Sequence, residues 1–156
     1  MPTLFLICGL PGAGKTTLAK QIEIERSALR LCPDEWIADL IENTANRQEF
    51  DRLRNPVEFL QWDVAKKVLS LGVNVVLENG FWTKDERERF KAEARTLGVR
   101  VELHFIDVSL DELWRRLENR NRNLPEKTLK VSKEELRLWM SLFQPPDAEE
   151  LASYDR

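Results

Sequence analysis

The residues most suited to chemistry in this chain lie in the segment GLPGAGKTT, residues 9–17. The pattern G-x-x-x-x-G-K-[ST] is matched without a gap by Gly9, Gly14, Lys15 and Thr16. Glycines let a backbone turn tightly around an anion and point successive N–H groups at it, and a helix that begins there adds the positive end of its dipole. In this pattern the lysine reaches the β- and γ-phosphates, and the hydroxyl of Thr16 is a ligand for Mg²⁺.

The segment therefore predicts a binding site for ATP and Mg²⁺. The predicted nucleotide-binding residues of the loop are Gly9, Leu10, Pro11, Gly12, Ala13, Gly14, Lys15, Thr16 and Thr17. A glycine-rich turn without a ligand is the alternative, but the context that the motif requires is present, since an apolar segment precedes it and an amphipathic segment follows. ATP is favoured over GTP because the sequence contains no N-K-x-D guanine signature.

A second candidate is Asp34, which follows the short apolar segment ALRLC at residues 28–32. If that segment is a strand of a parallel sheet, its carboxyl end lies at the edge where ligands bind. A carboxylate there can accept the proton of an incoming hydroxyl, so we predict Asp34 as the catalytic base, with Glu35 as the weaker candidate. Asp34 also suits the N-cap of a helix over residues 35–43, and the two roles are compatible.

A third candidate is Glu78, at the end of the apolar segment VNVVLEN, residues 73–79. An acid at the corresponding strand end of many nucleotide-binding sheets holds Mg²⁺, so Glu78 is predicted to assist Thr16 at the metal. A polar strand-end residue without a ligand is the alternative.

The residues that follow carry weaker indications. Phe81 and Trp82 are expected to pack against the helix of residues 57–71 rather than to line an acceptor pocket. Lys84 and Arg87 are expected to face water, although both would add positive charge to this rim.

The segment WRRLENRNRN, residues 114–123, contains a cluster of arginines. Arg116 and Arg120 are four residues apart and hence on one face of a helix, and Arg122 follows. Arginines brought over a γ-phosphate stabilise the charge that shifts during phosphoryl transfer, so Arg120 is predicted to be catalytic, with Arg116 and Arg122 as further nucleotide contacts. Stabilisation of a helix C-terminus is the alternative. A polar segment follows, which predicts a lid over approximately residues 116–131.

The elements that must position these residues alternate along the chain. Predicted strands cover residues 3–9, 28–32, 73–79 and 99–107. Predicted helices cover residues 15–27, 33–43, 57–71 and 83–98, and two more begin at the capping pairs Ser109–Glu112 and Ser132–Glu135. Residues 44–56 are polar and are predicted as either a mobile loop or a broken helix. This alternation predicts a three-layer α/β/α fold, with a mostly parallel sheet and helices on both faces, in one domain of residues 1–156.

The composition narrows the class of protein. The net charge of −3 argues against a sequence-independent nucleic-acid binder, although a local basic groove is compatible with it. No stretch approaches the roughly 18 apolar residues that cross a bilayer, and the N-terminus lacks the basic region of a signal peptide. Cys8 and Cys32 fall in or beside apolar segments and predict reduced core thiols, so a cytoplasmic protein is expected.

Together these segments resemble a small ATP-binding P-loop kinase of the AAA type. GLPGAGKTTLA, CPDEW, VVLENGFWTKDER, FIDVSLDELWRRLENRN and FQPPDAEE are similar to stretches in the group that contains zeta toxins, chloramphenicol phosphotransferase and the kinase domain of polynucleotide kinases. The resemblance spans nearly the whole chain and implies the P-loop NTPase fold. It implies a phosphate loop at residues 12–17, a catalytic acid at Asp34, and a lid arginine at Arg120 or at the neighbouring Arg122.

The resemblance also implies that Pro145 and Pro146 lie near the adenine. Two departures limit it. Ile37 and Ala38 stand where kinases of nucleic-acid ends often carry an arginine, and the D-G-x-P-R signature of nucleoside monophosphate kinases is absent from the sequence.

Three functions stay open at this point. The favoured one is an ATP-dependent kinase that moves the γ-phosphate of Mg-ATP to a hydroxyl of a small-molecule acceptor. A 5′-hydroxyl polynucleotide kinase is an alternative, which the acidic net charge and the missing arginine disfavour. An ATP-binding switch, or an ATPase without an acceptor, is another. The acceptor depends on residues 35–60 and 79–90, whose fold the sequence does not predict, and no membrane partner is expected.

Overall fold

A computed structural model describes residues 1–125 and 128–156. In this part of the chain four strands form one parallel sheet in the order β2-β3-β1-β4. Their bounds are Ala28–Leu31 for β2, Asn74–Gly80 for β3, Thr3–Cys8 for β1 and Arg100–Phe105 for β4. Every residue of the central strand β1 is buried, because helices cover both faces of the sheet.

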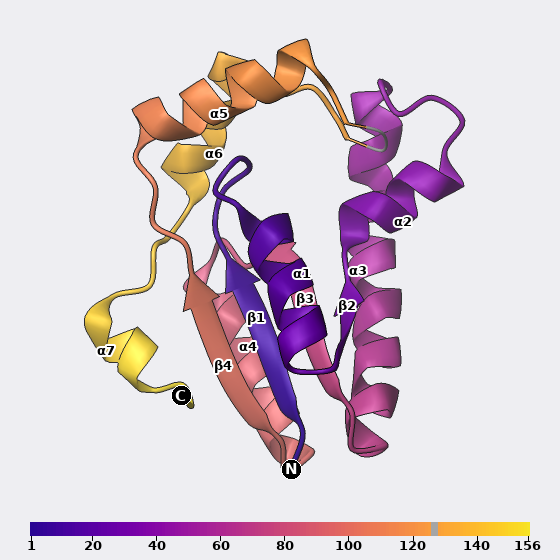
Figure 1. Ribbon diagram of the computed structural model, residues 1–156, viewed down its shortest axis with the longest axis vertical. Coiled ribbons are helices and arrows are strands. Elements are labelled where there is room, and N and C mark those ends of the chain that lie inside the picture. Colours follow the sequence, from indigo (N-terminus) through magenta and orange to yellow (C-terminus); the bar gives the residue numbers. More distant parts are fainter. Residues whose placement is uncertain (126–127) are drawn as a thin grey trace.

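The sheet lies between two layers of helices (Figure 1). On one face, Ala19 and Ile22 of α1 (Lys15–Glu25) pack in a cluster with Phe5 of β1. On the other face, α3 (Arg47–Ser70) and α4 (Lys84–Thr96) contribute Trp62 and Phe90 to the main core. The predicted three-layer α/β/α fold is therefore confirmed.

Three further helices lie around the carboxyl ends of the strands. α5 (Leu110–Arg122) and α6 (Lys133–Leu142) form an arch over the loop between β1 and α1 (Figure 1). Their buried leucines pack against that loop in one cluster, which contains Leu10, Ala13, Leu113, Leu117 and Leu136. Across the sheet edge, α2 (Pro33–Leu40) packs against the first half of α3 through Ile37, Ile41, Phe50 and Val57. Both groups of helices thus border the edge where parallel sheets bind ligands.

The predicted helix caps are confirmed. Thr83, Ser109 and Ser132 each accept a hydrogen bond from the backbone N–H three residues later, at the starts of α4, α5 and α6. Ser132 forms the full capping box, in which Glu135 returns a bond to the cap backbone. These local signals fixed three helix starts from the sequence alone.

The start of α3 differs from the prediction. Residues 47–56 are neither a loop nor a broken helix. They form the first part of α3, which begins at Arg47 and continues through Pro56. The side chain of Asn46 caps this helix by accepting a hydrogen bond from the N–H of Glu49. Phe50 and Val57 are seven residues apart and so lie on one face of the helix. This face is buried because α2 covers it.

The spacing of Val57, Leu60, Val64, Val68 and Leu71 predicts an apolar face on this helix, and that prediction is wrong in part. Leu60 and Leu71 are 55% and 80% exposed, whereas Gln61 and Trp62 are buried. The face of the helix that packs on the sheet is therefore not the one that the spacing of its aliphatic residues predicts.

Arg87 is fully buried, and the expectation that it faces water is wrong. Its Nε and Nη2 donate to the two carboxylate oxygens of Glu150 at 2.6 and 2.9 Å, and its Nη1 donates to the carbonyl of Phe81 at 2.9 Å. Glu150 belongs to α7 (Ala148–Ala152), a short helix that the sequence did not predict. This ion pair fastens residues near the C-terminus to α4 and to the loop after β3.

Within the ranges that the structure covers, Cys8 and Cys32 are buried free thiols. Burial raises the pKa of Cys8 to about 11 and that of Cys32 to about 12, so both stay protonated at neutral pH. Among the described helices, none combines the length and the apolar character that crossing a bilayer requires.

Replacing Glu150 with alanine is expected to destabilise the protein by about 3–5 kcal/mol, because the guanidinium of Arg87 would remain buried without its counter-charge. Urea unfolding gives the free energy of unfolding. The neighbouring exposed acid Glu149 is the matched control, and its alanine variant should change stability by less than about 0.5 kcal/mol. Equal unfolding midpoints for the two variants would show that α7 does not dock in this way.

Candidate functional site

The loop between β1 and α1 has the conformation of a phosphate cradle. Gly12 and Gly14 have φ angles of 84° and 102°, in the left-handed region that glycine adopts without steric cost. A Cβ on Gly12 would lie 2.9 Å from Cγ of Leu117, so the loop also approaches α5 too closely for a side chain. α1 begins directly after Gly14, at Lys15, and its first N–H groups are free to meet an anion at this loop.

Lys15 is folded back over the loop. Its Nζ donates to the carbonyl of Gly9 at 3.0 Å, and it forms no ion pair with any described residue. Burial lowers the pKa of this ammonium group, while the charges of Asp34 and Glu78 oppose the shift. A dehydrated ammonium without a direct counter-ion is a group that a bound polyanion would stabilise.

Thr16 and Glu78 meet at the neighbouring strand end. The hydroxyl of Thr16 donates to Oε1 of Glu78, and Oε2 of the same carboxylate accepts from Nη1 of Arg30 at 2.8 Å. Arg30 also donates to both carboxylate oxygens of Glu35, at 2.9 and 2.8 Å. Glu78 is therefore held beside Thr16 by an arginine from β2.

This arrangement fits Mg²⁺. In the described part of the chain no group of three or more His, Cys, Asp or Glu side chains could form a metal cage. Mg²⁺ at nucleotide sites needs no such cage, since it takes one or two protein oxygens and completes its shell with phosphate oxygens and water. Thr16 and Glu78 supply such oxygens beside the phosphate loop.

Asp34 lies in the first turn of α2 and not at its cap, because the N-cap position is Cys32 and the helix begins at Pro33. Its side chain is 56% exposed and accepts a hydrogen bond from Nη2 of Arg54 at 2.9 Å. Arg54 comes from the first half of α3. The carboxylate of Asp34 therefore borders open space beside Lys15 and is oriented by a neighbouring helix.

Two of the three predicted arginines of α5 line the cavity that contains Lys15, and Arg116 contacts the phosphate loop. Nη1 of Arg116 donates to the carbonyl of Ala13 at 3.2 Å. Nη2 of Arg120 lies 3.5 Å from the carbonyl of Leu129, and its buried Nε has no partner among the described residues. Burial lowers the pKa of Arg120, and the charge of Asp34 opposes this.

Arg122 departs from the prediction. Its side chain is 69% exposed and pairs with Glu118 at 3.2 Å on the outer surface of α5. The structure does not bring it to the phosphate loop, because it lies six residues after Arg116 and so projects from another face of the helix.

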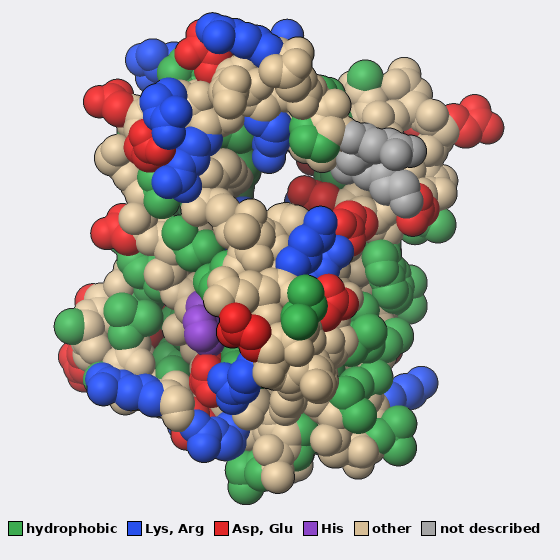
Figure 2. Space-filling model, in the orientation of Figure 1, with side chains coloured by type: hydrophobic (Ala, Val, Ile, Leu, Met, Phe, Trp, Pro, Cys, Tyr) green, Lys and Arg blue, Asp and Glu red, His purple; other side chains and the backbone are tan. Residues whose placement is uncertain are grey.

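A cavity of about 970 Å³ joins these groups. Figure 2 shows it as a hollow beneath the arch of α5 and α6, with Lys and Arg side chains gathered on the arch and acidic side chains at the opposite border. Its phosphate end holds Lys15, Thr16, Lys20, Arg116 and Arg120. We call the opposite part the α3 end, which is lined by Arg47, Phe50, Asp51, Arg54, Asn55, Glu58, Trp82, Thr83 and Glu86.

The aromatic residues after β3 have different positions. Phe81 is fully buried, with its ring 5.1 Å from that of Phe90, so the expectation of packing holds for it. Trp82 instead lines the cavity and packs against Trp139 of α6.

The predicted lid over residues 116–131 borders the cavity in part, through Leu129 and Val131 among others. Residues 126 and 127 of that range lie outside the described residues. Closure of this segment over a ligand stays a prediction.

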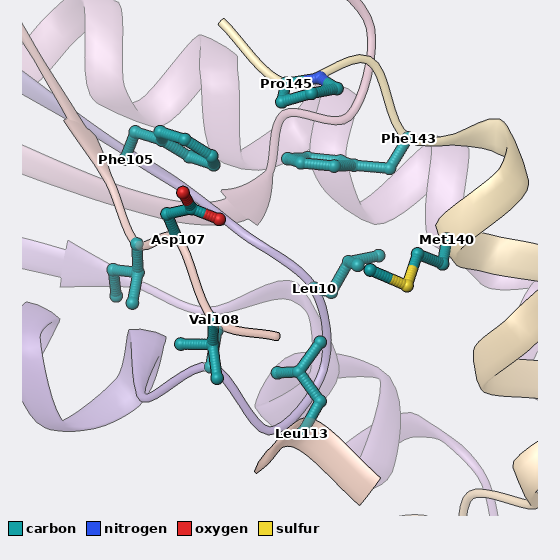
Figure 3. A pocket seen from close by; sticks show the side chains of 10 residues that line it. Leu10, Phe105, Asp107, Val108, Leu113, Met140, Phe143 and Pro145 are labelled. Carbon is teal, nitrogen blue, oxygen red and sulfur yellow. The ribbon is translucent and has the colours of Figure 1, made fainter. Parts of the chain in front are cut away.

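A second cavity of about 140 Å³ borders the loop at Leu10 and Ala13. The rings of Phe105 and Phe143 lie on its walls, with centroids 6.0 Å apart and planes inclined at 28°. Figure 3 shows the carboxylate of Asp107 beside the ring of Phe105. An apolar cavity beside the phosphate loop with one hydrogen-bond acceptor suits a purine that carries an amino group. Pro145 also lines this cavity, and its position near the adenine stays a prediction.

Sequence reasoning missed several residues of the site, namely Arg30, Arg54, Glu58 and Glu86. Arg54 and Glu58 belong to a polar stripe on α3 that also contains Arg47, Asp51 and Asn55. These positions recur at spacings of three and four, which is a helical signal. It can be recognised only when residues 47–56 are assigned to the same helix as residues 57–70.

The chain belongs to the AAA domain family AAA_33, whose model matches residues 4–146. Among curated protein sequences, none matches the chain. A provisionally assigned kinase from Chloroflexus aurantiacus j-10-fl is 21% identical, with a TM-score of 0.75 over 94% of this chain and 82% of that chain.

Two further solved structures share the fold. Kti12 from Chaetomium thermophilum, in complex with ADP-AlF3, is 15% identical, with a TM-score of 0.67 over 94% of this chain and 82% of that chain. A gluconokinase from Sinorhizobium meliloti 1021 is 15% identical, with a TM-score of 0.65 over 95% and 78% of the two chains. The chain thus has the α/β fold of P-loop NTPases, and its structural neighbours include kinases. These similarities do not distinguish the narrower group of zeta toxins, chloramphenicol phosphotransferase and polynucleotide kinases.

Replacing Gly12 with alanine is expected to weaken ATP binding at least tenfold, because a left-handed φ and a 2.9 Å approach to Leu117 would both displace the loop. Titration calorimetry with Mg-ATP measures the affinity. Gly98 is the matched control, since its φ is 71° but a Cβ added there would have no described atom within 4 Å. Its alanine variant should lose stability and keep ATP affinity, and an unchanged affinity in the Gly12 variant would contradict the role of the loop.

Proposed function

We propose that this AAA domain protein is an ATP-dependent kinase that transfers the γ-phosphate of Mg-ATP to a hydroxyl group of a small molecule. The observation that carries the proposal is that the phosphate loop, Asp34 and the arginines of α5 border one continuous cavity. A site that only bound a triphosphate would need no carboxylate beside the phosphates and no large space beyond them. Both features suit an acceptor that gives up a proton.

The nucleotide is bound from the loop outward. The N–H groups of Gly12 and of residues 14–17 and the ammonium group of Lys15 contact the phosphate oxygens, as in other loops of this pattern. The base would lie in the small cavity lined by Phe105, Phe143 and Pro145, where Asp107 would accept a hydrogen bond from its amino group.

Thr16 and Glu78 would hold Mg²⁺. When bound there, the ion neutralises charge on the phosphate oxygens and orients them. Arg30 fixes the direction of the Glu78 carboxylate through the hydrogen bond at 2.8 Å, and it anchors the start of α2 through Glu35. The same arginine thus couples the metal-binding side chain to the helix that carries Asp34.

The transfer step requires one base and compensation of charge. Asp34 accepts the proton of the acceptor hydroxyl while its oxygen forms a bond to the γ-phosphorus. The bond from that phosphorus to the β,γ-bridging oxygen breaks, and ADP leaves with the electron pair. Arg120, helped by Arg116, stabilises the negative charge that moves to the bridging oxygen. Arg54 orients the base through the 2.9 Å hydrogen bond.

The charges of the cavity disfavour a nucleic-acid acceptor. The α3 end contains the acids Asp51, Glu58 and Glu86 beside Arg47 and Arg54, so it offers little net positive charge to a phosphodiester backbone. The net charge of the chain is −3, which adds to the same effect.

Incubation with γ-labelled ATP, Mg²⁺ and a panel of hydroxyl compounds, antibiotics and 5′-hydroxyl oligonucleotides tests the function. We expect the label on a small molecule. Label on an oligonucleotide, or release of free phosphate alone with every acceptor, would contradict the proposal.

Replacing Lys15 with alanine should reduce both ATP affinity and turnover, since the ammonium group contacts the phosphates in the ground state and during transfer. Calorimetry and initial rates measure the two quantities. A variant that keeps wild-type affinity and rate would remove Lys15 from the site.

Replacing Asp34 with asparagine should leave ATP affinity within about twofold and lower the rate of transfer by about 10²–10⁴-fold, the usual contribution of a positioned base. The control is Asp111→Asn, which changes an exposed acid in the first turn of α5. Full transfer by the Asp34 variant would exclude it as the base.

A further inference from the structure

We propose that the acceptor carries a protonated amino group beside its hydroxyl, as amino sugars and aminocyclitols do, and that Glu58 and Glu86 bind this ammonium group at the α3 end of the cavity. The inference rests on the proposed function, because it names the class of acceptor for the same cavity. Its basis is an imbalance of charge in a part of the cavity that the nucleotide does not use.

Carboxylates outnumber cations at the α3 end. Its lining includes Asp51, Glu58 and Glu86, with Asp34 directly beside them, and the cations there are Arg47 and Arg54. Arg47 is engaged elsewhere, because it pairs with Glu135 of α6 at 3.2 Å and lies over the ring of Trp139.

Arg54 is therefore shared between carboxylates. It donates to Asp34 at 2.9 Å, whereas its closest approach to Glu58 is 3.7 Å, longer than a hydrogen bond. The side chain of Glu58 is only 17% exposed. Among the described residues, the mostly buried carboxylate of Glu58 thus has one counter-charge within 4 Å, and that arginine is already bonded to Asp34.

The pKa values of Glu58 and Glu86 agree with a shortage of positive charge around these carboxylates. Burial raises the pKa of Glu58 to about 7; Arg54 opposes the shift, and Glu86 and Asp34 add to it. Burial also raises the pKa of Glu86, against the charges of Arg89 and Arg87. An added cation between the two carboxylates would lower both pKa values and restore both charges.

These acids suit an organic cation better than a metal ion. Within the described ranges, no group of three or more His, Cys, Asp or Glu side chains could hold a metal ion. An ammonium group needs no such cage, because its three N–H donors can be satisfied by one or two carboxylates. Trp82 also lines this end and offers aromatic surface to the CH groups of a ring.

An acidic acceptor fits the same surface poorly. A carboxylate or phosphate on the acceptor would face Glu58, Glu86 and Asp51 with Arg54 as the nearest cation that is not already engaged on α6. Repulsion between like charges opposes the binding of an acidic acceptor. The α3 end thus selects among acceptors by repulsion as well as by attraction.

Calorimetry on the protein saturated with ADP and Mg²⁺ tests the inference independently of turnover. The probes are glucosamine and 2-deoxystreptamine, compared with N-acetylglucosamine, glucose and gluconate. We expect each amine to bind at least tenfold more tightly than the neutral and acidic probes. Glu58→Gln and Glu86→Gln keep the shape of the side chain and remove its charge, so each should reduce the preference for the amine at least fivefold. Asp63→Asn, at an exposed acid of α3 outside the cavity lining, should not change it.

Equal affinities, tighter binding of a neutral or acidic probe, no binding of either amine, or an unchanged preference in both variants would overturn the inference. The proposed function fails separately. If the amines bind through Glu58 but no labelled product forms with any acceptor, the amine-binding site stands and the kinase activity does not. If the label reaches a hydroxyl compound that carries no amine, the kinase activity stands and the inference does not.

Discussion

The loop after β1 carries positive charge that no described side chain neutralises directly, and the helices of the site are arranged around this loop. The ammonium group of Lys15 and the first N–H groups of α1 face one loop, which a fully buried strand holds in position. The nearby acids do not neutralise this charge directly, since Glu78 is bonded to Thr16 and Arg30, and Asp34 is bonded to Arg54. The loop therefore keeps its attraction for an anion from solution.

The cavity has two ends of opposite electrostatic character. Its phosphate end combines the loop with Arg116 and Arg120, whereas its α3 end is bordered by carboxylates around Arg54. A polyanion is attracted to one end and repelled from the other, so a nucleotide is directed to one orientation. Asp34 lies where the two ends meet, which is the position a base needs if it serves a reaction between ligands bound at each end.

Local patterns predicted the parts of the structure that depend on neighbours in sequence. The phosphate loop, the strand ends that carry Asp34 and Glu78, and three helix caps follow from motifs, from apolar runs and from the shared edge of parallel strands. Arg30, Arg54 and Arg87 could not be placed in this way, because their partners Glu78, Asp34 and Glu150 lie 48, 20 and 63 residues away. Each of these contacts exists only after the sheet and its helices are assembled.

The carbonyl of Phe81 accepts hydrogen bonds from Nη1 of Arg87 and from Sγ of Cys8, and Arg87 is itself held by Glu150. The next carbonyl, that of Trp82, accepts from the N–H of Gln144 at 2.8 Å. One wall of the cavity thus receives its last supports from residues 144–150. During synthesis on the ribosome these residues follow all four strands of the sheet, so this wall cannot reach its final form before α7 has been made and has docked.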